Sequence, residues 1–263
     1  MVDAALLNWT LSQVLKVLII MTRVGPVLFL MPVMASETVP VQVRVFFTVV
    51  TSLALAPVIA VTPADLPATA IGFGVFVARE VAFGGVLAIF VRLVFAAVET
   101  AGQMIGIQMG MGVAGVIDPQ FGNQVSPVGL LWNVTTILLF LTINGHHLFF
   151  RAIVDSYRWV APGTLHITQA TFDGVMQGTL HMFVLAVKIM APASAAIFFT
   201  HVAMGIIAKT VPQIPILIVG LPINIGIGLI FVGLSLGYLI PLLIANFDML
   251  GRLLPKLSMG MGG

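Results

Sequence analysis

The chain has 263 residues, of which 60% are hydrophobic and only 8% are charged, whereas soluble domains carry about 25% charged residues. So few ionisable side chains cannot cover a globule of this size in water. The composition argues against a soluble enzyme, a disordered chain or a fibrous protein, and it indicates an integral membrane or membrane-assembly protein. The net charge of +2 offers no basic surface for nucleic acid, and the lack of cysteine removes disulfides and thiolate metal sites.

Six apolar regions predict long helices, because about 20 apolar residues in a helix cross the core of a bilayer. They cover residues 6–33, 43–61, 70–111, 128–150, 178–207 and 216–246. The stretches between them contain proline, glycine and asparagine, which favour turns. We therefore expect an all-α fold with one long central loop. The first region should stay in the mature protein, since no basic segment precedes it as in a signal peptide.

The third apolar region, residues 70–111, is about twice as long as one membrane span. It is expected to be either a helical hairpin or a helix that stands out of the bilayer. If it crossed the membrane once, four later basic residues would lie on the outer side, against the positive-inside rule. They are Arg151, Arg158, Arg252 and Lys256. A simple bundle of six spans is therefore not expected.

Charged side chains interrupt the apolar regions, and a charge at the bilayer centre costs about 2.5 to 3.5 kcal/mol. Lys16 and Arg23 lie in the first region, and the spacing of Arg92, Glu99 and Gln103 puts them on one helix face. This face is either a structural ion pair between packed helices or a polar stripe along a conduit or partner interface. The candidate buried polar or interface residues are Arg79, Glu80, Arg92, Glu99, Gln103 and Lys188.

Glycines recur at every fourth position at Gly102, Gly106 and Gly110, which leaves one helix face without side chains. Another backbone can approach such a face closely, and Gly233 and Gly237 form a similar pair in the last third of the chain. Ordinary helix packing is one interpretation of this spacing. The glycines that follow Gly110 suggest another, in which the helix leads into a loop that can fill a passage.

Residues 110–126 are expected to form a loop, because further glycines and a proline disfavour a helix there. Non-helical backbone at membrane depth is tolerated only where it is buried in protein or lines a cavity. Methionine adapts its shape and glycine permits unusual dihedrals, so such a loop can fill a passage and move away. The candidate loop residues are Gly110, Met111, Gly112, Gly115, Asp118, Pro119, Phe121 and Gly122.

The histidines do not indicate an enzyme. His146 and His147 are adjacent, so they cannot share a helix face as the histidines of a zinc protease do, and they predict a helix end or tight turn. No metal, nucleophile or phosphate-binding motif is present in the sequence. The alternative to a structural protein is a proton-coupled carrier of a small solute that would use Glu80 and Glu99.

The last third is expected to be a helical hairpin. A helix over residues 178–207 leads to a turn at residues 209–215, and Gly220 to Pro222 are expected to interrupt the second helix. That helix should end near Asp248. Interrupted apolar helices also occur in transporters, which keeps the carrier alternative open.

Five short motifs, in this order, resemble the FliR family of flagellar export-gate proteins, which is related to a family of virulence type III secretion systems. They are residues 101–112 (AGQMIGIQMGMG), 118–120 (DPQ), 144–147 (NGHH), 211–213 (VPQ) and 220–222 (GLP). The resemblance runs from the first apolar region almost to the C-terminus. One departure is Pro215, where the family usually has asparagine, and it affects the geometry of that turn.

The resemblance implies an all-α assembly of long helical hairpins. A FliP-like portion, residues 1–175, would carry a plug loop at residues 110–126, and residues 176–263 would form a FliQ-like hairpin with a C-terminal tail. Such a subunit would line and plug a channel for unfolded flagellar proteins, without a cofactor or metal. The implied partners are FliP-like and FliQ-like subunits, FlhB-like and FlhA-like export components, and the lipid of the bacterial inner membrane around the flagellar basal body.

Overall fold

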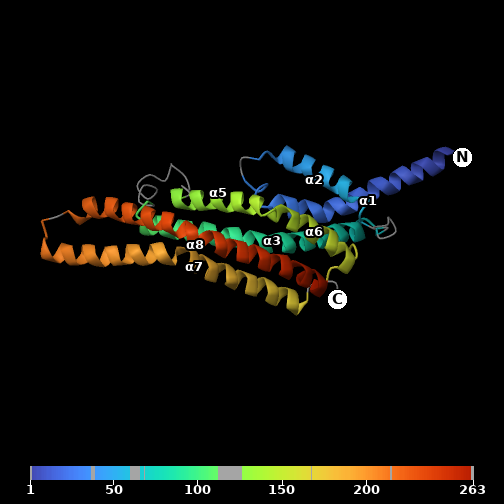
Figure 1. Ribbon diagram of the computed structural model, residues 1–263. Coiled ribbons are helices and arrows are strands. Elements are labelled where there is room, and N and C mark those ends of the chain that lie inside the picture. The colour runs from blue at the N-terminus through green and yellow to red at the C-terminus, as the bar shows by residue number, and fades with distance from the viewer. Residues whose placement is uncertain are drawn as a thin grey trace. The chain divides into compact units, whose positions relative to one another are not determined.

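The computed structural model describes residues 2–36, 39–59, 66–67, 69–111, 126–166, 168–213 and 215–261. Helix is the only regular secondary structure in these ranges, which confirms the predicted all-α fold. The helices are shown in chain order in Figure 1. They are α1 (Val2–Leu30), α2 (Val41–Leu55), α3 (Ala70–Gln108), α5 (Pro127–Thr142), α6 (Gly145–Trp159), α7 (Gln169–Thr210) and α8 (Ile216–Met261).

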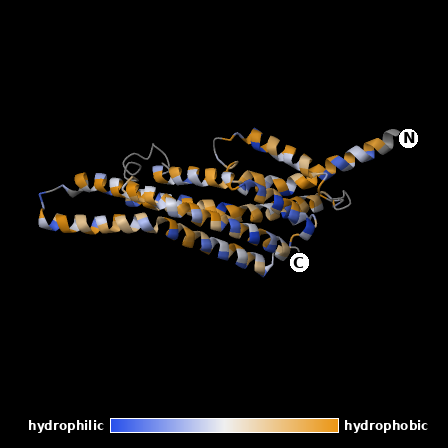
Figure 2. Cartoon of the chain, viewed as in Figure 1, coloured by the Kyte–Doolittle hydropathy of each residue, from blue (hydrophilic) through white to orange (hydrophobic). Residues whose placement is uncertain are grey.

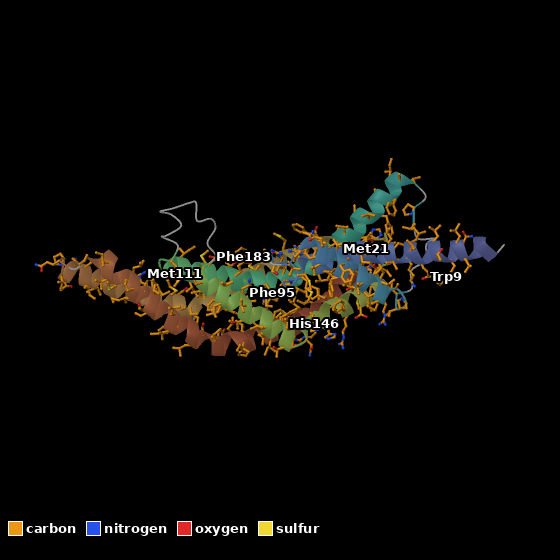
Figure 3. The ribbon with its side chains drawn as sticks, turned by 90° about the horizontal axis from the view of Figure 1, so that it is seen from above. Trp9, Met21, Phe95, Met111, His146 and Phe183 are labelled. Carbon is orange, nitrogen blue, oxygen red and sulfur yellow. The ribbon has the colours of Figure 1, made fainter. Side chains whose placement is uncertain are left out.

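Four stretches of helix in the described ranges are long and apolar enough to cross a membrane. They are Leu6–Leu30, Ala70–Gln108, Gln169–Thr210 and Ile218–Met261. Large apolar side chains stand exposed along them, as Trp9 does on α1, where 62% of its surface is accessible (Figure 3). These features define an integral membrane protein with fewer long apolar helices than six spans would need.

One prediction about helix continuity is wrong, and one open choice is decided. Of the two alternatives for the third apolar region, residues 70–108 form one continuous helix and not a hairpin, and at about 1.5 Å per residue this helix is about 58 Å long. The predicted interruption of the last helix is wrong. α8 continues through Gly220 and Pro222 and past Asp248 to Met261. In apolar surroundings an early end would expose unpaired backbone groups, so a helix tolerates proline there more readily than in water.

The turn predicted at the adjacent histidines is confirmed. α5 ends at Thr142, and Asn144 has a φ of 56°, in the left-handed region that asparagine tolerates better than most residues. α6 then starts at Gly145, so His146 and His147 lie in its first turn with their ring centroids 4.4 Å apart.

The chain divides into two compact units. Unit 1 contains Met1–Arg92, Asn144–Gly178 and Phe247–Gly263, and unit 2 contains Leu93–Ile143 and Thr179–Asn246. Helices α3, α7 and α8 each contribute to both. The predicted boundary between residues 175 and 176 lies inside α7, which is continuous there, and the division into FliP-like and FliQ-like parts stays a prediction.

In unit 1, α2 packs on α1 with its polar residues inward. Thr48, Thr51 and Ser52 are buried, and the hydroxyls of Thr48 and Ser52 donate to carbonyls one turn earlier in the helix. Phe46 and Leu53 on the opposite face are 70% and 61% exposed. This inverted polarity fits a protein whose outer surface does not face water.

The last turn of α8 is hydrogen-bonded to the segment between α6 and α7. The His166 amide donates to the carbonyl of Met261 at 3.2 Å, and the Thr168 hydroxyl donates to the carbonyl of Gly260 at 3.2 Å. These bonds satisfy carbonyl groups that a helix end leaves without a partner inside the helix. These hydrogen bonds join distant segments of unit 1.

In unit 2, the parts of α7 and α8 run side by side as a hairpin (Figure 1). Two polar contacts join the helices: His181 Nε2 lies 2.7 Å from Asn246 Oδ1, and Asn224 Nδ2 lies 2.8 Å from His201 Nε2. Because an added Cβ at Gly228 would lie 2.6 Å from Met109 Cγ, the Met109 side chain fills the notch that this glycine leaves in α8.

Candidate functional site

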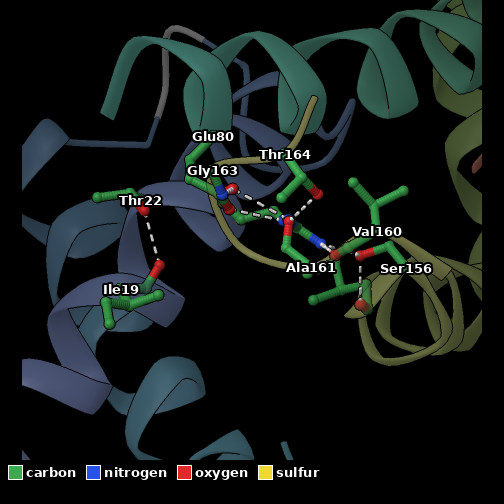
Figure 4. Close-up of polar contacts among 10 residues, drawn as sticks. Ile19, Thr22, Glu80, Ser156, Val160, Ala161, Gly163 and Thr164 are labelled. Atoms are coloured by element: carbon green, nitrogen blue, oxygen red, sulfur yellow. Dashed lines mark hydrogen bonds and ion pairs between the residues drawn. The ribbon is translucent and has the colours of Figure 1, made fainter. Parts of the chain in front are cut away.

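The most buried charges of unit 1 form one cluster, centred on Arg23 of α1 and Glu80 of α3. Figure 4 shows Glu80 beside Gly163 in the segment that follows α6. Arg23 Nε donates to Glu80 Oε2 at 2.7 Å, and Arg23 Nη2 donates to Oε1 at 3.0 Å. The side chains are 0% and 1% exposed. A bidentate pair of this kind is the strongest geometry for arginine and a carboxylate.

Further groups complete the hydrogen bonds of this pair. Arg23 Nη1 donates to the Ser156 hydroxyl at 3.2 Å and to the Val160 carbonyl at 3.1 Å, both in or after α6. The Gly163 amide donates to Glu80 Oε1 at 2.8 Å. The charges therefore tie α1 and α3 to α6 and to the segment that follows it.

Close packing surrounds the guanidinium group. Its Cζ lies 4.4 Å from the ring centroid of Phe83 and 4.0 Å from that of Tyr157, so the cation sits between two aromatic faces. An added Cβ at Gly84 would overlap the Arg23 carbonyl, which shows how closely α1 and α3 approach. The cluster is satisfied and tightly packed, so its chemistry is that of a structural anchor rather than of an exposed acid or base.

A second arrangement, in unit 2, lies where α3 ends and α5 begins. An added Cβ at Gly102 would overlap the backbone of Gly129, and one at Gly106 would overlap the Ser126 side chain. The Ser126 amide donates to Gln103 Oε1 at 3.2 Å. Two of the three predicted ladder glycines thus let α3 and the start of α5 touch.

The third ladder glycine, Gly110, ends α3. Its φ is 81°, its amide donates to Ile107, and the Met111 amide donates to Gly106, in the hydrogen-bond pattern of a glycine-terminated helix. α3 ends at Gln108 and α5 begins at Pro127, as the expected loop requires. Six of the candidate loop residues lie outside the described residues: Gly112, Gly115, Asp118, Pro119, Phe121 and Gly122.

The other candidate residues are not brought together. Arg79, Arg92, Glu99 and Lys188 are exposed, although Arg79 Nη1 donates to the Gly163 carbonyl at 2.9 Å. Within the described ranges Arg92 and Glu99 form no ion pair with each other. An added Cβ at Gly233 or Gly237 would meet nothing within 4 Å, so contacts of these glycines with another subunit stay a prediction.

Sequence reasoning missed that Arg23 is the partner of Glu80. The available signal was that each charge lies in an apolar region, where an ionised group needs an opposite charge. It also missed Gly84 and Gly163, whose closeness to other groups depends on packing. Over the residues that the structure describes, no group of three or more acidic, histidine or cysteine side chains could hold a metal ion.

The fold and these two arrangements define a helical membrane protein whose long helices are fixed by a buried ion pair and by backbone contacts at glycine. Residues 14–250 match the family described as "Bacterial export proteins, family 1". The chain belongs to this family and is a FliR-type component of the flagellar export apparatus.

Three relatives illustrate the similarity. The flagellar biosynthetic protein FliR of Pectobacterium carotovorum subsp. carotovorum is 28% identical over 232 residues, which cover 86% of this chain and 88% of that protein. FliR of Caulobacter vibrioides is 28% identical over 229 residues, 86% of this chain and 90% of that protein. FliR of Bacillus subtilis strain 168 is 33% identical over 155 residues, 58% of this chain and 60% of that protein.

Proposed function

We propose that the chain is a structural and gating subunit of the flagellar export gate in the bacterial inner membrane, and that residues 110–126 plug its channel. Unfolded flagellar proteins would pass along a wall to which this subunit contributes. The subunit acts passively, without a catalytic group or cofactor. Energy for transport comes from a separate ATPase and from the proton gradient.

The observation that carries this proposal is the fixed geometry at both ends of the central loop. Gly110 stops α3, and Ser126 is held against Gly106 and Gln103 at the start of α5. Two anchored ends limit where the residues between them can reach. A segment with several glycines between such anchors is suited to fill a passage and to leave it again.

The exposed charges support a place in a larger assembly. Lys188 stands on α7 beside Val184 and Val187, which are 43% and 58% exposed. A lysine among lipid-facing side chains is costly, so a partner subunit with an acidic or polar group is the better neighbour. We propose FliP-like and FliQ-like subunits as the direct partners, with FlhB-like and FlhA-like components nearby, and we assign residues 1–175 and 176–263 to FliP-like and FliQ-like parts.

The carrier alternative is weaker because of the state of Glu80. Both of its carboxylate oxygens accept hydrogen bonds, from Arg23 and from the Gly163 amide. Protonation would leave Arg23 as an uncompensated buried charge, which is strongly destabilising. A carboxylate in this position serves poorly as a site that binds and releases a proton in each transport cycle.

The plug is tested by deletion of residues 110–123 in the complex with FliP-like and FliQ-like subunits. We expect the complex to assemble and its ion conductance in planar bilayers to rise well above that of the parent complex. A variant in which a glycine-serine linker of equal length replaces residues 112–123 separates loss of the plug side chains from shortening of the chain. An assembled deletion complex with the conductance of the parent would refute the plug.

A further inference from the structure

Helix α6 carries an exposed polar face. With about 100° per residue, His147, Arg151 and Arg158 fall on one side, and all three are exposed. Phe149 and Ile153 on the opposite side are 2% and 0% exposed. Figure 2 shows the hydrophilic positions along this helix. α6 is therefore amphipathic, with its apolar side in the core of unit 1.

The polar face of α6 is cationic. Within the described ranges Arg151 has no ion-pair partner, and Arg158 Nη1 lies 3.4 Å from Asp155 Oδ1. That pair is exposed, with 73% of the Arg158 side chain and 38% of the Asp155 side chain accessible, so it neutralises little of the charge at long range. Trp159 follows at the end of the helix and is 49% exposed.

The last turns of α8 bring two more cations into the same unit. An added Cβ at Gly251 would lie 3.0 Å from Leu148 Cδ1, so α8 packs closely on α6 at this point. Arg252 follows directly and Lys256 one turn later, and both are exposed. Four cations from two distant parts of the sequence are thus gathered on two touching helices.

We propose that the exposed face of α6, formed by Arg151, Arg158 and Trp159, binds the phosphate headgroups of anionic phospholipids at the membrane surface. Arginine pairs well with phosphate oxygens. Tryptophan is enriched at the boundary between lipid and water, and amphipathic helices with arginine and tryptophan lie in that plane. The positive-inside rule puts such a cluster at the cytoplasmic surface, where anionic lipid attracts it.

The test uses the full-length chain in neutral detergent and a fluorescent phosphatidylglycerol, with phosphatidylcholine as the neutral lipid. We expect the parent to prefer phosphatidylglycerol, and R151Q/R158Q to bind it about 25-fold more weakly, at about fivefold for each arginine. Binding of phosphatidylcholine should not change. The variant K16Q/K209Q also removes two cations, which belong to α1 and α7 and not to α6 or α8, and it should keep the affinity of the parent.

A variant that should bind phosphatidylglycerol more tightly is also needed, because misfolding can weaken binding but does not strengthen it. D155N removes the one carboxylate on this face and frees Arg158, so it should bind phosphatidylglycerol about fivefold more tightly. The proposal is overturned if R151Q/R158Q binds phosphatidylglycerol as the parent does, or if K16Q/K209Q loses as much. Unchanged lipid binding together with lost flagellar export would instead identify the face as a contact for an acidic protein segment.

Discussion

At the scale of single residues, Arg23 and Glu80 form a buried ion pair in which each charge needs the other. Each ion is fully removed from solvent, so its free energy depends on the partner and on the hydrogen bonds around it. Loss of one partner leaves a charge in an apolar core, whereas joint replacement by apolar residues of similar size can be nearly neutral. The cluster therefore makes the two side chains dependent on each other.

Glu80→Gln should lower the free energy of unfolding by about 3–5 kcal/mol, because the amide cannot neutralise Arg23. The measurement is the midpoint of denaturant-induced unfolding of the purified chain in detergent. The double variant R23M/E80M should recover most of this loss. Asp155→Asn, which breaks the exposed pair with Arg158, should change stability by less than about 1 kcal/mol. Equal losses from the buried and the exposed pair would contradict this account.

The sequence predicted that these charges avoid lipid but not which groups pair. Arg23 and Glu80 are 57 positions apart, and their meeting depends on how α1 packs on α3. Gly163, a third member of the cluster, has no local motif that would mark it. Residue type alone therefore showed that each buried charge needs a partner, whereas the identity of that partner followed only from the packing of the helices.

At the scale of helices, close backbone contact in unit 2 depends on individual glycines. Gly106 lies against Ser126, whereas Gly233 faces open space within the described residues. The two positions share a residue type and a helical environment and differ in their neighbours. They form a matched pair for substitution.

Gly106→Ala should destabilise the isolated chain by about 1–3 kcal/mol, because the methyl group displaces Ser126 and breaks its bond to Gln103. Gly233→Ala should instead stabilise it by about 0.5–1 kcal/mol, since alanine loses less backbone entropy in a helix. Thermal unfolding of the detergent-solubilised variants gives both values. Effects of the same sign at the two sites would show that the contact with Ser126 is unimportant.

Helix type and approximate position followed from the apolar periodicity, but continuity did not. Proline and glycine predict breaks by rules learned mainly in water, where an open backbone group can bond to solvent. α8 passes through Pro222 because no such solvent is available to an apolar segment. The end of α3 near Gly110 was predicted from the glycines and the proline that follow, and in the structure a left-handed glycine closes the helix there without leaving carbonyls unpaired.

At the scale of the whole molecule, apolar side chains and isolated charges share the outer surface. Glu99 and Lys188 are exposed on long apolar helices, and Phe198 and Phe199 are 63% and 69% exposed. A patch of this kind on a single chain marks contact with lipid or with other subunits. At the charged positions, contact with other subunits is favoured over contact with lipid, because lipid tails cannot solvate a charge.

Glu99→Gln should leave the stability of the isolated chain unchanged, because its side chain is exposed, and should lower the yield of the complex with FliP-like and FliQ-like subunits several-fold. Co-purification on a tagged partner, quantified per unit of expressed chain, gives the comparison. Lys209→Gln, at the end of α7, serves as the charge control. A Glu99→Gln complex recovered at the yield of the parent, with normal flagellar export, would remove this residue from the interface.

Unit 1 is assembled from three stretches of the polypeptide, and the carbonyls of Gly260 and Met261 accept bonds from the segment between α6 and α7. During translation, α1 and α2 are made well before the segments that form these hydrogen bonds. Unit 1 cannot complete these hydrogen bonds until the last turn of α8 has been synthesised. Completion of unit 1 thus depends on residues that are synthesised long after α1 and α2.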